Sequence, residues 1–292
     1  MSKGVAMEEK KRGCACAFPI VLGIIVISVV LYNLFTPKTH NSSTSKTGLS
    51  QVATKEFEGY YLRFGDEFKP GLTAIDDLGL SIVIAIDCSG SMKEYPKSGQ
   101  NTEKYMIASQ ALTEIVDFLE NSYNKTWKKD KIKIKIGLIK FSNDVDTLFE
   151  LAEMNTEAFA KLRAVTSDPK SFYPNGSTAI GETLERGAEA LAQSGTIFKS
   201  LIVISDGENT SGVEPDEVMT AIVENKNNKT TDDFPVSTSN ILVSFIGFDM
   251  DAGDFTELHD LGARVMTAGN KEELNKSMTD IFLADINKLE AK

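Results

Sequence analysis

Five oxygen-bearing side chains have the residue types and spacing of ligands for a hard metal ion. Asp87, Ser89 and Ser91 alternate in one short polar segment, and Thr178 and Asp206 follow later in the chain. Together they offer two carboxylates and three hydroxyls, with no sulfur or imidazole. Mg²⁺, Ca²⁺ and Mn²⁺ prefer oxygen ligands of this kind. This five-ligand set therefore predicts a site for Mg²⁺, or for Ca²⁺ or Mn²⁺.

Two apolar stretches position the carboxylates. Residues 82–86 and 201–204 are continuous runs of apolar β-formers, which is typical of parallel strands covered on both faces. Asp87 directly follows the first run, and Asp206 closely follows the second. Ligands of open α/β sheets bind outside the carboxyl ends of the strands. If the two strands are neighbours, the two carboxylates meet at one edge of the sheet.

Thr178 is expected near the start of a helix. It closes the segment Asn175-Gly176-Ser177-Thr178, and apolar residues then recur at helical spacing in Ile180, Leu184, Ala188 and Leu191. A helix start beside the two strand ends completes the five-ligand set.

Each of these residues also has a simpler explanation. Asp87 and Asp206 can cap the helices that follow their strands, and Ser89 and Ser91 can be turn residues. Capping, however, does not require hydroxyls both two and four residues after the aspartate. The joint pattern therefore favours the metal site.

The remaining pattern alternates strands and helices. This order predicts a doubly wound, mostly parallel sheet with helices on both faces. The expected helices cover residues 102–121, 156–164, 215–225, 255–261 and 272–289, and the expected strands cover residues 132–141, 145–151 (antiparallel), 241–248 and 264–267 (an edge strand).

These motifs resemble the von Willebrand factor A domain with a complete metal-ion-dependent adhesion site. The resemblance rests on Asp87-Cys88-Ser89-Gly90-Ser91-Met92, on Gly176-Ser177-Thr178 and on Ile204-Ser205-Asp206-Gly207-Glu208. It implies that the hydroxyls face the metal and that the aspartates hold it directly or through water. It also implies that an Asp or Glu carboxylate of a partner protein or peptide completes the coordination. Cys88 occupies a variable position and is expected to point into the core.

The N-terminal region predicts a membrane anchor. Residues 17–35 carry no charge and, with Cys14 to Cys16 before them, supply about the 20 residues that cross a bilayer. Four basic residues precede this stretch and three follow it within twenty residues, so the N-terminus is expected in the cytoplasm. A cleaved signal peptide is the alternative, but the apolar stretch is long and no small-x-small cleavage site follows it.

The chain of 292 residues is accordingly divided into five parts. The expected parts are a cytoplasmic tail (1–13), a transmembrane signal anchor (14–35), a flexible tether (36–55), a possible extra strand or hairpin (56–78) and the von Willebrand factor A domain (79–290). This layout predicts a single-pass membrane protein whose domain is extracytoplasmic, in the periplasm or at the cell surface.

Net charge argues against a nucleic-acid partner. The chain carries −11, and the part after residue 35 carries −13, whereas phosphate binding needs positive charge. The lysine-rich run of residues 125–135 alternates with isoleucines at its end and is interpreted as the solvated face of a strand. The acidic cluster of Asp249, Asp251 and Asp254 lacks the downstream glutamate of a calcium loop and is interpreted as turn residues.

Three classes of function follow from these observations. The first is a membrane-tethered binding module, without catalysis, that recruits a partner carboxylate through a divalent cation. The second is a structural subunit of a pilus or secretion-type assembly, in which the metal only stabilises loops. The third is a metal-dependent hydrolase, which is disfavoured because the chain has two histidines and none of the usual nucleophile, zinc or phosphate-binding motifs.

Overall fold

The computed structural model describes residues 59–70, 79–231 and 236–290. All of these residues belong to one compact unit, Phe57–Lys292. The expected cytoplasmic tail, membrane anchor and tether lie outside the described residues. In the part that is described, no helix is both long and apolar enough to span a bilayer.

The domain is built on one six-stranded sheet. The strands are β1 (Gly79–Asp87), β2 (Lys133–Phe141), β3 (Val145–Glu153), β4 (Phe198–Ser205), β5 (Ile241–Phe248) and β6 (Arg264–Ala268). Their order is β3-β2-β1-β4-β5-β6, and only β3 runs antiparallel. This confirms the mostly parallel sheet, the central position of β1 and the edge position of β6.

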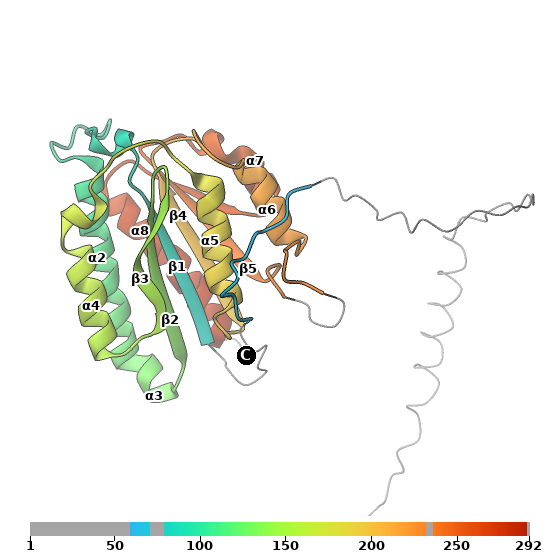
Figure 1. Cartoon of the computed structure of the whole chain (residues 1–292). Helices are drawn as coiled ribbons and strands as arrows, with labels where there is room; N and C mark the ends of the chain where they lie inside the picture. The colour runs from blue at the N-terminus through green and yellow to red at the C-terminus, as the bar shows by residue number, and fades with distance from the viewer. Residues whose placement is uncertain (1–58, 71–78, 232–235, 291–292) are drawn as a thin grey trace, which may run out of the picture. The chain divides into compact units, whose positions relative to one another are not determined.

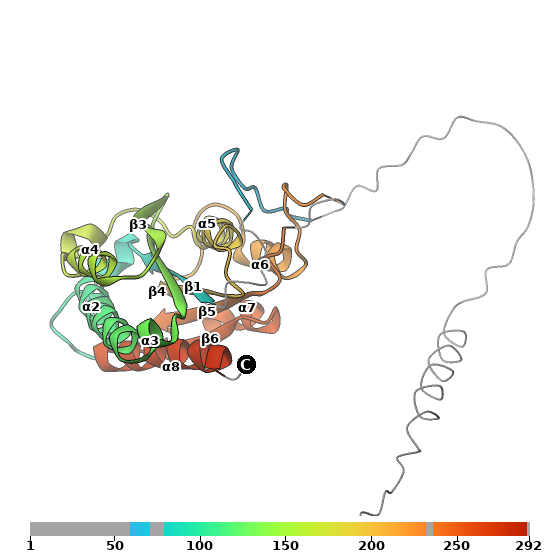
Figure 2. The same cartoon turned by 90° about the horizontal axis from the view of Figure 1, so that it is seen from below.

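Helices cover both faces of this sheet. The α-helices are α2 (Lys104–Ser122), α3 (Lys128–Asp130), α4 (Thr156–Thr166), α5 (Ile180–Ala192), α6 (Pro215–Val223), α7 (Thr256–Asp260) and α8 (Lys271–Glu290). The short helical turns are η1 (Gly90–Lys93), η2 (Tyr123–Trp127, a π-helix), η3 (Pro169–Phe172) and η4 (Ala252–Phe255). Helices α2, α4 and α8 lie on one face, and α5 and α6 lie on the other (Figure 1, Figure 2). Strands β1 and β4 begin three residues before the apolar runs 82–86 and 201–204, and the other expected boundaries agree with the structure within two residues.

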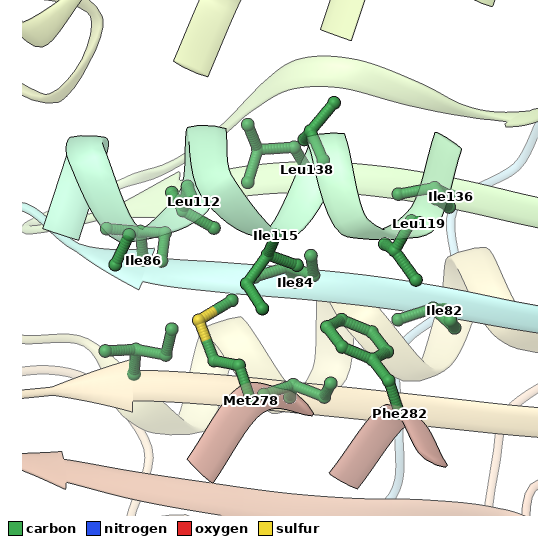
Figure 3. Packing of buried hydrophobic residues seen from close by; sticks show 14 of the residues in the cluster. Ile82, Ile84, Ile86, Leu112, Ile115, Leu119, Ile136, Leu138, Met278 and Phe282 are labelled. Atoms are coloured by element: carbon green, nitrogen blue, oxygen red, sulfur yellow. The ribbon is translucent and has the colours of Figure 1, made fainter. Parts of the chain in front are cut away.

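The position of strand β1 between two layers of helices explains why its apolar run is continuous. Ile82, Ile84 and Ile86 face helices α2 and α8, where they pack among residues that include Leu112 and Phe282 (Figure 3). The residues between them join the core on the opposite face, beneath α5 and α6. Because successive side chains of a strand point to opposite faces, a strand with helices on both sides has no position that faces solvent.

Residues 59–70 form an extended strap against the face that carries α5 and α6. Leu62 makes an isolated parallel bridge with Asn227, and both Leu62 and Phe64 are buried in the core of that face. The backbone amide of Gly65 donates a hydrogen bond to Glu189 of α5 at 2.7 Å. The strap is therefore an integral part of the domain.

The lysine-rich run differs from its interpretation as a strand face. Lys125 lies in the π-helix η2, Lys128 begins α3, and Lys131 ends this helical stretch with a left-handed backbone (φ 55°). Only Lys133 and Lys135 lie in β2. The alternation begins at Ile132, so the earlier lysines carried no period that distinguishes helix from strand.

Candidate metal centre

The two carboxylates of the five-ligand set lie at the same edge of the sheet. Strands β1 and β4 pair in parallel, with Ile86 opposite Ile204. Asp87 is therefore the last residue of β1 beside the end of β4, and Asp206 follows Ser205, the last residue of β4. The predicted adjacency of the two strands is confirmed.

A chain of hydrogen bonds connects four members of the set. The Ser205 hydroxyl donates to Asp87 Oδ2 at 2.5 Å, and the Ser89 amide donates to Asp87 Oδ1 at 2.7 Å. The hydroxyl oxygens of Ser89 and Ser91 lie 2.9 Å apart, and Ser91 Oγ donates to Asp206 Oδ1 at 2.7 Å. The loops after β1 and β4 therefore hold two carboxylates and two hydroxyls in one connected group.

Backbone hydrogen bonds bring the Thr178 loop to the same edge. The Gly90 amide donates to Gly176 O at 3.0 Å, and the Asn175 amide donates to Cys88 O at 2.7 Å. The Thr178 amide donates to Thr210 Oγ1 at 2.9 Å, which links this loop to the segment after β4. Thr178 is buried and lies two residues before α5, as its position near a helix start predicted.

Gly176 is required by the close approach of this loop to the hairpin between β2 and β3. Its backbone is left-handed (φ 87°), and a Cβ there would lie 2.6 Å from Asn143 Oδ1. That oxygen accepts the Ser177 amide at 2.8 Å. Any larger residue would displace the loop that carries Thr178.

Burial of the two carboxylates makes a cation energetically favourable at this site. Asp87 is completely buried, and burial raises its pKa to about 6. The nearby Asp206 raises the pKa further, while the hydrogen bonds from Ser205 and Ser89 act in the opposite direction. Two carboxylates close together in a low-dielectric environment repel each other, so a cation between them is favourable.

Two charged residues at this edge were not predicted from the sequence. Lys104, at the start of α2, places its ammonium 2.9 Å from Asp206 Oδ2 and 3.5 Å from Asp249 Oδ2. Glu94, which is exposed, lies 3.8 Å from the same ammonium. The sequence did contain a sign that Lys104 is unusual. This lysine lies on the same side of α2 as the buried apolar residues, and it occupies the N-terminal end of the helix, where the helix dipole disfavours cations.

Asp249 is more than the turn residue that was expected. It directly follows β5 with a left-handed backbone (φ 62°), and its Oδ1 accepts the Lys97 amide at 3.0 Å. Asp251 and Asp254 form a capping box at η4, which confirms their local turn role.

The donor chemistry of the site fits a hard divalent ion. Within the described ranges no group of three or more His, Cys, Asp or Glu side chains could hold a metal. The five-ligand set instead combines two carboxylates with three hydroxyls. Cys88 is buried in the core as expected, and burial, with Asp87 adding to it, raises the pKa of its thiol to about 12. The site therefore presents only oxygen ligands at neutral pH, which suits Mg²⁺ or Ca²⁺.

Comparisons with known proteins identify the family. The model of the von Willebrand factor type A domain matches residues 81–287, and the chain belongs to this family. No curated protein matches the sequence significantly.

Solved structures share the fold at low sequence identity. The chain is similar to a von Willebrand factor type A protein from Catenulispora acidiphila (19% identity, TM-score 0.49, 70% of this chain and 42% of that chain). It is similar to the PilB minor pilin from Streptococcus sanguinis (16%, 0.51, 70% and 60%). It is also similar to BatB from Bacteroides thetaiotaomicron (22%, 0.50, 73% and 100%). The chain thus spans less than two thirds of the first two relatives, and its likeness to the PilB minor pilin and to BatB concerns the fold.

Proposed function

We propose that this protein is a membrane-tethered binding module that recruits a partner through a divalent cation, with Mg²⁺ as the first candidate. The five-ligand set holds the ion, and an Asp or Glu carboxylate of a partner protein or peptide completes its coordination. The module performs no catalysis of its own. Its domain lies outside the cytoplasm, in the periplasm or at the cell surface, and residues 14–35 anchor it.

The observation that carries this proposal is the hydrogen-bonded group at the carboxyl edge of the sheet. Asp87, Ser89, Ser91 and Asp206 come from two loops and share one chain of hydrogen bonds. Structural capping explains each residue alone, but it does not explain why both loops direct oxygens to one point. Three of the five ligands are neutral hydroxyls, so a bound ion keeps part of its charge for an outside carboxylate.

Calorimetry of the full-length chain with MgCl₂ tests the metal site. We expect one site with a Kd on the order of 10⁻⁴ to 10⁻³ M, similar to extracellular calcium modules. Asp87→Ala and Ser91→Ala should abolish or strongly weaken binding. Ser237→Ala is the matched control, because Ser237 lies before β5 at the opposite edge of the sheet. Equal binding by all four proteins would contradict the proposed site.

Co-purification from native membranes tests the recruiting role. Partner proteins should remain bound in Mg²⁺, dissociate on chelation and be absent with Asp87→Ala. A partner that binds equally in chelator would favour the structural-subunit alternative. Protease protection of the intact membrane preparation tests the topology, since an extracytoplasmic domain is cleaved only from that side.

A further inference from the structure

Lys104 is the central residue of a group of buried charges next to the candidate metal centre. Its side chain is only 7% exposed, and the carboxylates of Asp206 and Asp249 that contact it are 0% and 5% exposed. The ammonium lies 2.9 Å from Asp206 Oδ2 and 3.5 Å from Asp249 Oδ2, and these two carboxylates stabilise its positive charge. The ammonium is therefore a fixed positive charge in direct contact with one proposed metal ligand.

The geometry divides the two oxygens of Asp206 between different partners. Oδ1 accepts the Ser91 hydroxyl, on the side of the five-ligand set, and Oδ2 accepts Lys104. The ammonium and any ion held with the help of Asp206 thus share one carboxylate. Because both are cations, each weakens the attraction of Asp206 for the other.

Asp249 is held in place as the second partner of Lys104. The backbone amide of Lys97 donates to Asp249 Oδ1, and Lys97 Nζ donates to its backbone oxygen at 3.0 Å. The amide of Asp249 in turn donates to Ala268 O at 2.7 Å. These bonds fix a carboxylate that contacts the ammonium and lies outside the five-ligand set.

We propose that Lys104 is a built-in counter-ion that sets the affinity of the metal site, with Asp249 offsetting its effect. This inference rests on the proposed divalent-cation site. Lys104 neutralises part of the charge of Asp206, so it weakens the hold on the ion and keeps the metal-free site folded. Asp249 draws the charge of the ammonium away from Asp206 and so strengthens the site.

The net charge of these groups suggests why a lysine is placed beside the metal site. The buried groups Asp87, Asp206, Asp249 and Lys104 carry a net charge of −2, which one divalent ion neutralises. Glu94 also faces the ammonium, but its side chain is exposed and its charge is screened by water. Without the ammonium, the loaded site would keep one negative charge in a chain that already carries −11. An incoming carboxylate would then be repelled. Lys104 therefore lowers the affinity for the metal ion and, by neutralising the loaded site, allows an acidic partner to approach.

Opposite substitutions at the two residues test the proposal. We would titrate MgCl₂ calorimetrically into the full-length chain at constant ionic strength, with Lys104→Met, Asp249→Asn and the double variant. Lys104→Met should tighten Mg²⁺ binding about tenfold, because a divalent ion and an ammonium across one carboxylate repel strongly even when partly screened. Asp249→Asn keeps an oxygen for the Lys97 amide and suits a left-handed backbone, and it should weaken binding several-fold. Because Asp249 acts through the ammonium, the double variant should bind Mg²⁺ about as tightly as Lys104→Met.

A second measurement separates electrostatics from simple loss of packing. In chelator, Lys104→Met should lower the melting temperature, and Mg²⁺ should raise it by more than in the wild type. Lys271→Met is the matched control, because it breaks an exposed ion pair with Glu114 on α2 and α8. It should leave the Kd for Mg²⁺ unchanged.

The outcomes distinguish this inference from the proposed function. If the wild type binds Mg²⁺ and both single variants weaken binding, or neither changes it, Lys104 has only a structural role and the inference is overturned. If Lys104→Met does not fold, Asp249→Asn alone decides, since unchanged or tighter binding contradicts the proposal. If neither the wild type nor any variant binds Mg²⁺, the proposed metal site itself is refuted and the inference with it.

Discussion

The substitution Asp87→Asn is expected to stabilise the metal-free protein, although it removes a proposed metal ligand. Asp87 is completely buried, and burial raises its pKa from 3.8 to about 6. That rise corresponds to about 3 kcal/mol of unfavourable free energy for the ionised form in the folded state. Asn carries no charge, and its amide group can still accept from the Ser89 amide and contact the Ser205 hydroxyl. In chelator at pH 7, Asp87→Asn should therefore raise the free energy of unfolding by about 2 to 3 kcal/mol.

The pH dependence of the free energy of unfolding provides a second test of this prediction. Above pH 3.8 the unfolded chain ionises Asp87, while the folded protein keeps it protonated until about pH 6. The contribution of Asp87 to stability is thus highest below pH 4, falls as the pH rises from about 4 to 6, and stays low above that. Urea unfolding of the wild type and the variant in chelator should give curves that agree near pH 4 and separate by pH 6.

Magnesium should reverse the ranking of the two proteins. Saturating Mg²⁺ should stabilise the wild type and leave Asp87→Asn unchanged, because stabilisation by a ligand requires binding to the folded state. If the variant is less stable than the wild type in chelator at pH 7, or if the two pH profiles run in parallel, the assignment of a costly buried charge to Asp87 is wrong.

Four further substitutions test the fold by urea unfolding. Gly181→Ala should destabilise by about 2 kcal/mol or more, since a Cβ would lie 2.1 Å from the Val213 backbone oxygen, whereas Gly253→Ala, with no atom within 4 Å, should be close to neutral. Phe282→Ala removes a fully buried ring between α8 and β1 and should lower the free energy of unfolding by about 3 to 5 kcal/mol, and a loss below 1 kcal/mol would contradict this packing. Lys199→Met should stabilise by about 1 kcal/mol, because burial lowers the pKa of this lysine and so disfavours its charged form; a destabilised variant would show that the ammonium has a compensating partner.

The spacing of side chains was enough to predict most of the architecture. Continuous apolar runs such as residues 82–86 occur only where helices cover both faces, so the central place of β1 follows from sequence. Helical spacing in residues 180–191 likewise placed α5 and, with it, Thr178 near a helix start. The stretch around Lys125 and Lys128 shows the limit of this reasoning, because it has no apolar period and folds as helical turns.

By itself, the sequence determined which oxygens stand at the ends of which strands, because strand period and residue order fix this locally. Only the tertiary structure decided which charges surround them. Lys104, Asp206 and Asp249 lie far apart in the chain, and the parallel order of β1, β4 and β5 brings both carboxylates to within 3.5 Å of the Lys104 ammonium. Electrostatic energy depends on distance in space and on burial, and neither quantity can be read from separation along the chain.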